Sequence, residues 1–169
     1  MMLTKLPRAL AVAIIMLACV GCDQATKLVA KEHLRPGEII SFAGDTFRLQ
    51  YAENTGAFLG LGSSLPERWR HLIFTVLVGF FLLGLMFYVL LSRELLIAQV
   101  LYLTLVLGGG TSNLLDRIVY DGRVIDFLNV GIGPIRTGIF NVADMAITAG
   151  ALLLAVESFR KTPQRSAGS

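Results

Sequence analysis

The chain has 169 residues, of which 54% are hydrophobic and 16% are charged, and its mean hydropathy is +0.68. Soluble domains do not have this composition, so the sequence indicates a small integral membrane protein. The net charge of +3 is spread over both termini and the loops rather than gathered on one face, which argues against a nucleic-acid partner. The basic residues suit membrane lipids, whose head groups we expect them to contact.

The first apolar segment follows Lys5 and Arg8 and runs over residues 9–21. Taken alone, this pattern is typical of a secretory signal, or of a lipoprotein-type signal that leaves a mature chain starting at Cys19 or Cys22. Three further apolar segments follow in the chain. They favour a first segment that is retained as a membrane helix.

This first span extends over about residues 9–30, because Asp23 and Lys27 stand four residues apart and can pair on one helix face. The cysteines Cys19 and Cys22 have no second cysteine pair and no histidine nearby to complete a metal site. A redox pair of this spacing would need a βαβ context, which the segment lacks. We therefore interpret both as small apolar residues and expect neither a metal nor a cofactor.

The longest polar connection covers residues 31–71. Its segments 38–42 and 46–51 are rich in β-branched and aromatic residues and flank Gly44-Asp45, which predicts a small hairpin. The following residues 53–62 supply asparagine and glycine for a turn, beside apolar side chains. A plain turn and a loop that contacts substrate are both open interpretations.

Residues 72–91 carry no charge and, at about 1.5 Å per residue, are long enough to cross a hydrocarbon core of about 30 Å. A short turn separates them from the uncharged residues 95–115, so these two helices are expected to be antiparallel neighbours. The glycines 108–110 allow either close helix packing or a distortion of the helix. Residues 137–156 are the fourth span, and residues 161–169 form a loose tail.

Four spans place both termini on one side of the membrane, and we treat residues 1–169 as a single integral-membrane domain. Basic residues are numerous on both sides, so the positive-inside rule does not say which side this is. The topology does bring several polar residues to one membrane face. They are Asp23, Asn54, Asp116, Asp126 and Asp144.

Most of the acidic residues have a simple structural explanation. Asp116 beside Arg117 reads as an ion pair at a helix end, and Asp121 before Gly122 reads as a turn residue. An aspartate inside an apolar span costs roughly 2.5–3.5 kcal/mol at the helix centre, so an unexplained one marks a candidate functional site.

Asp126 and Asp144 are the aspartates that structure explains least, although an exposed loop carboxylate is a simple interpretation of Asp126. Asp126 lies between apolar residues, and Asp144 has Asn141 rather than a basic residue three positions before it. Two carboxylates held close together in apolar surroundings share one proton, which provides a base and an acid side by side. This is the equipment of an aspartic protease, which needs no metal.

Other catalytic machinery is sparse. The sequence has no H-E-x-x-H run, and its two histidines, His33 and His71, offer little to a zinc mechanism or to a serine–histidine dyad. Ser112 has no base nearby, so we expect it to serve helix packing.

At these residues the sequence resembles the bacterial lipoprotein signal peptidases, the type II signal peptidase family of membrane aspartic proteases. The matching blocks, in chain order, are Asp23-Gln24-x-Thr26-Lys27, Asn54-Thr55-Gly56-Ala57-Phe58, Asn113-x-x-Asp116-Arg117, Val124-x-Asp126-Phe127 and Phe140-Asn141-x-Ala143-Asp144. Five blocks in this order on a four-span chain make a specific match that covers nearly the whole chain.

The resemblance implies that Asp126 and Asp144 form a catalytic dyad that cuts diacylglyceryl-modified prolipoproteins on the amino side of the lipidated cysteine. It also implies a multi-pass protein of the bacterial cytoplasmic (inner) membrane, with both termini in the cytoplasm and the active site near the outer leaflet. Residues that would contact substrate or support the dyad are Asn54, Gly56, Asn113, Arg117 and Asn141. Residues that would brace the structure are Asp23, Lys27 and Asp116.

Two positions depart from the family pattern. Phe58 stands where a second alanine is usual, and Ser112 stands where a glycine usually precedes the asparagine. They bear on the shape of the substrate loop and on how closely the third helix packs.

The sequence thus predicts an all-α membrane protein of four transmembrane helices with a small β-rich extracytoplasmic element, acting as a monomeric prolipoprotein signal peptidase. The alternative is a small four-helix proton-coupled transporter with Asp144 as its relay. A relay belongs near the middle of a span, whereas Asp144 lies about seven residues into the predicted one. A transporter would also have little use for the long polar loop.

Overall fold

The computed structural model describes residues 5–57 and 61–161. Phe58 and the tail after residue 161 lie outside this part of the chain. Within it, four helical segments are long and apolar enough to cross a membrane. Their elements are α1 (Lys5–His33), the continuous run α2 (Glu67–His71), η2 (Leu72–Leu77) and α3 (Val78–Leu91), then α4 (Ile97–Val119) and α5 (Val142–Lys161).

The four predicted spans are therefore confirmed, but their bounds differ from the predicted ones. The first helix extends beyond residues 9–30 at both ends, the second begins before residue 72, and the third is shifted from residues 95–115 toward its C-terminal end. The fourth span begins at Val142 rather than residue 137 and ends at Lys161 rather than residue 156. It begins later because Phe140 pairs with Leu128 as an isolated β-bridge, so this segment extends the sheet.

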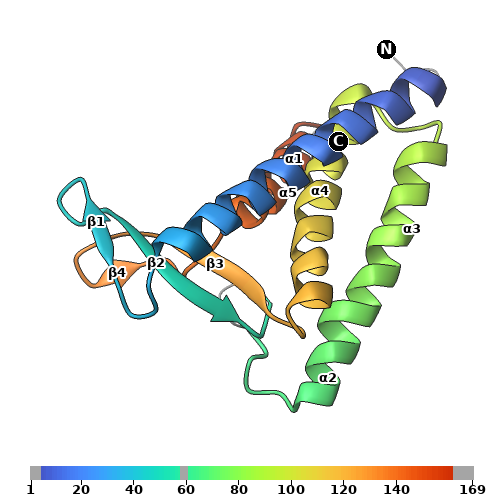
Figure 1. Cartoon of the computed structure of the whole chain (residues 1–169). Coiled ribbons are helices and arrows are strands. Elements are labelled where there is room, and N and C mark those ends of the chain that lie inside the picture. Colours follow the sequence, from blue (N-terminus) through green and yellow to red (C-terminus); the bar gives the residue numbers. More distant parts are fainter. Residues whose placement is uncertain (1–4, 58–60, 162–169) are drawn as a thin grey trace, which may run out of the picture.

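A four-stranded antiparallel sheet projects from one end of the helices (Figure 1). Its strands, in spatial order, are β1 (Ile40–Phe42), β2 (Phe47–Asn54), β3 (Val124–Ile132) and β4 (Ile135–Arg136). The predicted hairpin is confirmed as β1 and β2. The sequence did not predict β3, which pairs with β2 in a register that sets Asp126 opposite Ala52.

The glycines of α4 let three helices approach it closely, as predicted. A Cβ atom on Gly108 would lie 2.7 Å from the Cβ of Cys19 in α1, and one on Gly110 would lie 2.7 Å from Leu82 in α3. A Cβ on Gly109 would collide with the carbonyl oxygen of Ala143 in α5. Cys19 is thus a small packing residue at a helix crossing.

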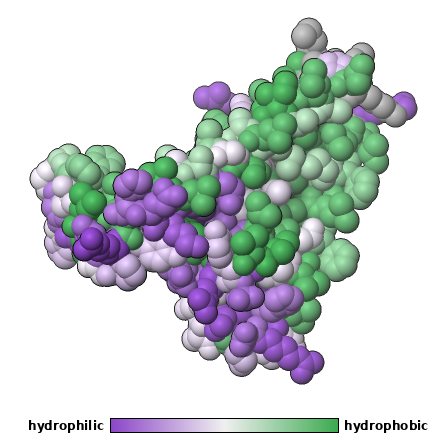
Figure 2. Space-filling view, in the orientation of Figure 1, coloured by the Kyte–Doolittle hydropathy of each residue, from purple (hydrophilic) through white to green (hydrophobic). Residues whose placement is uncertain are grey.

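The molecule has an apolar helical part and a polar end (Figure 2). Large side chains on the helices face outward, among them Phe80, Phe81 and Leu152, each at least 60% exposed. A surface of this kind is stable in lipid, where exposed apolar side chains cost nothing. Most of the buried polar residues lie toward the sheet end.

Arg8 is an exception at the opposite end. It is buried and donates hydrogen bonds to the backbone oxygens of Ser92 and Leu95 in the turn between α3 and α4. Because these carbonyls have no partner within a helix, the guanidinium satisfies them and holds the start of α1 against this turn.

Candidate active site

Asp126 lies in β3 and is 2% exposed. Its two carboxyl oxygens each accept one hydrogen bond from an asparagine amide. Asn54 Nδ2 donates to Oδ2 at 3.0 Å, and Asn141 Nδ2 donates to Oδ1 at 2.7 Å. Asn54 ends β2, so the pairing of the two strands brings this amide to the carboxylate.

Asp144 lies in the first turn of α5, directly after Asn141 has ended the extended segment. The two residues bond reciprocally: the Asp144 N–H donates to Asn141 Oδ1 at 2.9 Å, and the Asn141 N–H donates to Asp144 Oδ2 at 3.3 Å. This pattern is a capping box, which satisfies free N–H groups at a helix start. Asn113 of α4 donates to the remaining oxygen, Oδ1, at 2.9 Å.

Asn141 links the two carboxylates. Its Nδ2 donates to Asp126 Oδ1, and its backbone N–H donates to Asp144 Oδ2. The structure therefore brings Asp126 of β3 and Asp144 of α5 together, and Asn141 is hydrogen-bonded to both.

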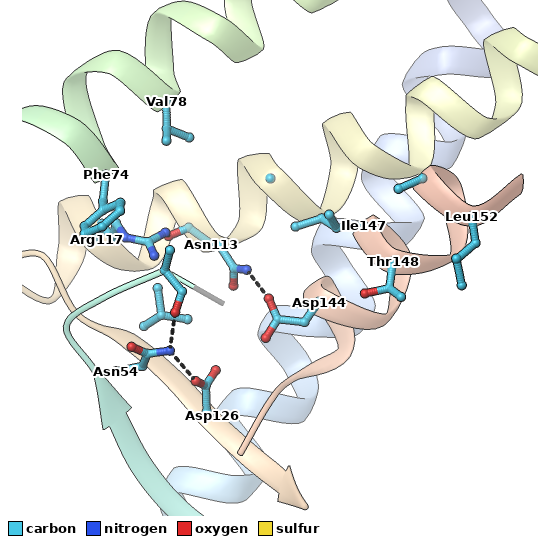
Figure 3. Close-up of a pocket in the computed structure, with 14 residues that line it drawn as sticks. Asn54, Phe74, Val78, Asn113, Arg117, Asp126, Asp144, Ile147, Thr148 and Leu152 are labelled. Carbon is cyan, nitrogen blue, oxygen red and sulfur yellow. Dashed lines mark hydrogen bonds between the residues drawn. The ribbon is translucent and has the colours of Figure 1, made fainter. Parts of the chain in front are cut away.

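Both carboxylates line one cavity of about 410 Å³ (Figure 3). Asp126 enters it from β3 and Asp144 from α5, so both can reach a molecule bound between them. The other lining residues are Asn54, Ala57, Phe74, Val78, Gly110, Asn113, Arg117, Val124, Ile147, Thr148, Ala151 and Leu152.

Burial makes the carboxyl group of Asp126 a weaker acid than an ordinary aspartate. It raises the pKa of the carboxyl group to about 7, outweighing the hydrogen bond from Asn54, and the charge of Asp144 acts in the same direction as burial. This carboxyl group therefore changes its charge near neutral pH.

Arg117 holds the loop after β2 against α4. Its guanidinium donates to Gly56 O at 2.7 Å and to Asn113 O at 3.3 Å, and it stacks 5.9 Å from the centre of the Phe74 ring. The predicted ion pair between Asp116 and Arg117 is wrong, because the Asp116 carboxylate is turned toward Lys27 at 2.8 Å.

The loop after β2 starts with a turn that Asn54 closes. The Gly56 N–H donates to Asn54 Oδ1 at 2.9 Å, and Asn54 Nδ2 donates to Ala57 O at 3.1 Å. The segment is therefore a turn, and Asn54 and Ala57 also line the cavity, whereas contact between this loop and a substrate stays a prediction.

A cluster of buried charges lies behind the site. Lys27 contacts Asp23 at 2.6 Å, which confirms the predicted pair, and it contacts Asp116 on α4 as well. Ser112 does more than pack, because its hydroxyl donates to Asp23 at 2.7 Å. Asp121 has a φ of 51° in the turn after α4, as expected for a turn residue.

Several residues at the site were not predicted from the sequence. Gln24 stands in a family block without an assigned role, and its amide donates to Asp116 at 2.7 Å and to Ser112 Oγ at 3.0 Å. Thr148 and Leu152 follow Asp144 at four and eight residues, so helical spacing alone would have found them. Phe74 comes from a distant helix and carries no such signal.

Among the described residues, no group of three or more histidine, cysteine, aspartate or glutamate side chains is placed to hold a metal ion. The hydrogen bonds described for the two carboxylates come from side-chain and backbone amide groups.

Fold and site together define a multi-pass membrane protein with a buried pair of aspartates beside a cavity at the sheet end of its helices. Residues 15–160 match the family model described as signal peptidase (SPase) II, so the chain belongs to the signal peptidase II family. Members of this family are proteases.

Relatives support this assignment over most of the chain. A lipoprotein signal peptidase of Syntrophus aciditrophicus is 36% identical over 144 residues, covering 85% of this chain and 89% of the relative. A lipoprotein signal peptidase of Moorella thermoacetica is 37% identical over 138 residues, covering 82% and 85%. A solved bacterial membrane enzyme shares the fold, with a TM-score of 0.79 and 22% identity, covering 94% of this chain and 93% of that one.

Proposed function

We propose that this protein is an aspartic endopeptidase that removes signal peptides from diacylglyceryl-modified prolipoproteins, cutting on the amino side of the lipidated cysteine. Asp126 and Asp144 are the catalytic dyad. The observation that carries the proposal is the pair of buried carboxylates, linked through Asn141, that face one cavity. The relatives named lipoprotein signal peptidase supply the substrate class.

The dyad works with one proton shared between two carboxyl groups. The ionised carboxylate takes a proton from water, and the water oxygen attacks the peptide carbonyl carbon. The protonated partner donates a hydrogen bond to the carbonyl oxygen. The tetrahedral intermediate collapses when the C–N bond breaks and the leaving amine takes a proton from the dyad. A pKa of about 7 for Asp126 suits a pair that holds one proton at neutral pH.

A second cavity, of about 550 Å³, supports a substrate with a large apolar part. It lies along α5 and shares Asp144, Thr148 and Leu152 with the first cavity. Its other lining residues are Thr137, Phe140, Met145 and Ala149. An apolar ligand group bound there would lie directly beside the scissile bond.

The proposed location is the bacterial cytoplasmic membrane, where the protein acts as a monomer surrounded by lipid. Both termini lie in the cytoplasm, and the sheet and active site lie at the outer leaflet. This orientation agrees with the site's position at the sheet end, since a lipidated cysteine sits at the membrane surface and its signal peptide crosses the bilayer.

The transporter alternative has little support. Asp144 lies in the first turn of α5, where it caps the helix, rather than at the middle of a span. The family match extends over both aspartates and most of the chain.

The test is cleavage of a purified diacylglyceryl-modified prolipoprotein in the presence of EDTA. We expect the wild type to cleave it, and Asp126→Asn and Asp144→Asn each to lose about 10³-fold or more in kcat, because neither can exchange the shared proton. Asp45→Asn is the matched control, since Asp45 pairs with Arg48 on the sheet and does not line the cavity. Normal turnover by either dyad variant, or loss of wild-type activity in EDTA, would contradict the proposal.

A further inference from the structure

Three charged residues, Asp23, Lys27 and Asp116, lie behind the cavity without lining it. Their side chains are 0%, 2% and 1% exposed. Buried charges are expensive unless each finds partners, and this cluster is fully enclosed by protein. Hydrogen bonds join the cluster to residues adjacent to the proposed dyad.

Each of the two carboxylates in the cluster accepts a hydrogen bond from the backbone N–H of a residue next to a dyad residue. Asp23 Oδ1 accepts from the N–H of Ala143 at 2.8 Å, and Ala143 precedes Asp144. Asp116 Oδ2 accepts from the N–H of Ile125 at 3.1 Å, and Ile125 precedes Asp126. Each dyad residue is thus attached to a peptide group that a buried carboxylate holds.

Lys27 is the only described residue that contacts both of these carboxylates through an ion pair. Its Nζ lies 2.6 Å from Asp23 Oδ2, 2.8 Å from Asp116 Oδ2 and 3.0 Å from Asn113 Oδ1. A lysine ammonium has three protons and no acceptor, so these three contacts use all of its donors.

The third contact fixes the direction of Asn113. Because an ammonium can only donate, Asn113 must present its oxygen to Lys27, and its Nδ2 must then point toward Asp144, 2.9 Å away. The opposite orientation would set an NH₂ group against the ammonium and leave an amide oxygen facing a carboxylate.

The same constraint passes on to Asn141. The oxygen of Asn113 accepts a second hydrogen bond, from Asn141 Nδ2 at 3.1 Å. With its NH₂ group directed there, Asn141 also donates to Asp126 at 2.7 Å and leaves its oxygen for the N–H of Asp144. One ammonium therefore sets the direction of two amides, which deliver an N–H to each dyad carboxylate.

We infer that Lys27 is a positioning residue for catalysis: it orients the amides of Asn113 and Asn141 toward the dyad and joins the two carboxylates that hold the dyad's backbone. This inference rests on the proposed dyad. It differs from the simpler role of bracing the first helix, which requires only that Lys27 neutralise nearby charge.

The experiment uses a charge-balanced variant of the full-length protein. Replacing Lys27 alone leaves two carboxylates facing each other, so Lys27→Met risks misfolding. The double variant Lys27→Met/Asp116→Asn keeps the net charge of the cluster at −1, because one carboxylate and the ammonium are removed together. The matched control is Lys31→Met, which removes the same charge one helical turn further along α1, where Lys31 stacks on Tyr120.

Folding is followed by thermal unfolding, and function by kcat and KM on a diacylglyceryl-modified prolipoprotein. We expect the double variant to fold and to lose about 100-fold in kcat, as expected for misplaced catalytic groups, while KM changes little because Lys27 does not touch the cavity. Lys31→Met should behave like the wild type. A double variant that folds and keeps its kcat within about threefold would show that Lys27 only braces the helix.

A second readout needs no substrate. The infrared carbonyl band of protonated Asp126, assigned by its absence in Asp126→Asn, reports the protonation of that residue directly. Asp126 faces Asp144 on α5, Lys27 on α1 and Arg117 on α4, besides the amides of Asn54 and Asn141. We expect the band to titrate at a higher pH in the double variant than in the wild type, because an ammonium and an oriented amide that favour the carboxylate are lost.

The two readouts separate the possible failures. An unshifted band in a folded double variant would overturn the inference whether or not the protein is a peptidase. A shifted band together with a wild type that cleaves no prolipoprotein would leave Lys27 as the orienting residue and would reject the proposed function instead.

Discussion

At the scale of single residues, Asp126 makes the stability of the protein depend on pH. Its pKa is raised to about 7 in the folded protein, mainly by burial, whereas in the unfolded chain it returns to its ordinary value of 3.8. The unfolded state therefore releases its proton first as the pH rises. The free energy of unfolding should therefore fall as the pH rises from the unfolded pKa of 3.8 to the folded pKa of about 7. The slope is about 1.4 kcal/mol per pH unit at most, and the free energy levels off above pH 7.

The measurement is thermal unfolding of the wild type and Asp126→Asn in detergent at several values between pH 4 and pH 9. The variant cannot ionise at this position, so the wild type should lose stability relative to it as the pH rises. Curves that run parallel over the whole range would contradict the prediction. In Asp126→Asn, the NH₂ group of the new side chain faces the NH₂ group of Asn54 or Asn141. This lowers the stability of the variant by an amount that does not depend on pH, so the difference in pH dependence remains.

Single residues were also the part of the site that the sequence predicted best. Asp126 was singled out because it lies among apolar residues, and Asp144 because it has no basic residue three or four positions away. Asp116 was assigned the wrong partner for the complementary reason. Its neighbour Arg117 is adjacent in sequence, but consecutive helix residues do not face each other, and Lys27 reaches Asp116 from another helix.

At the scale of elements, the close packing of α4 against α5 can be tested by comparing a glycine substitution in α4 with one in α3. Gly109→Ala should lower both Tm and kcat, because its methyl group would push away the carbonyl of Ala143 and shift the start of α5 that carries Asp144. The control is Gly84→Ala in α3, since a methyl group there meets no atom within 4 Å. We expect the control to match the wild type within about 1 kcal/mol. Equal behaviour of the two variants would refute the role of close packing at Gly109.

The helices and the β1–β2 hairpin could be predicted because their signals are local: uncharged runs, and strand residues around a turn. Strand β3 could not be predicted in the same way. Its first four residues are all buried, including Asp126, so the alternation of inward and outward residues that marks a half-buried strand is missing. Its partner β2 lies far away in the sequence, and only the folded chain brings the two together.

At the scale of the whole molecule, the positive-inside rule failed for a physical reason. The rule counts the lysine and arginine residues of the connections between spans, whatever role their side chains have in the folded protein. Several arginines on the sheet side lie in folded structure and pair with acids: Arg48 contacts Asp45 at 2.5 Å, and Arg123 contacts Glu53 at 2.9 Å. The short turn between α3 and α4 carries the more informative charge, at Arg93.

The proposed orientation can be tested with single cysteines in a background without Cys19 and Cys22. Arg93→Cys marks the exposed turn between α3 and α4, and Ile135→Cys marks the tip of the sheet, where Ile135 is 81% exposed. If the sheet faces outward, a membrane-impermeant thiol reagent should label Ile135→Cys in intact bacterial spheroplasts and label Arg93→Cys only after lysis. The reverse pattern would place the cavity at the inner leaflet. A lipidated cysteine displayed at the outer leaflet could not then reach the dyad. Labelling at these two positions therefore decides between the proposed orientation in the membrane and the opposite one.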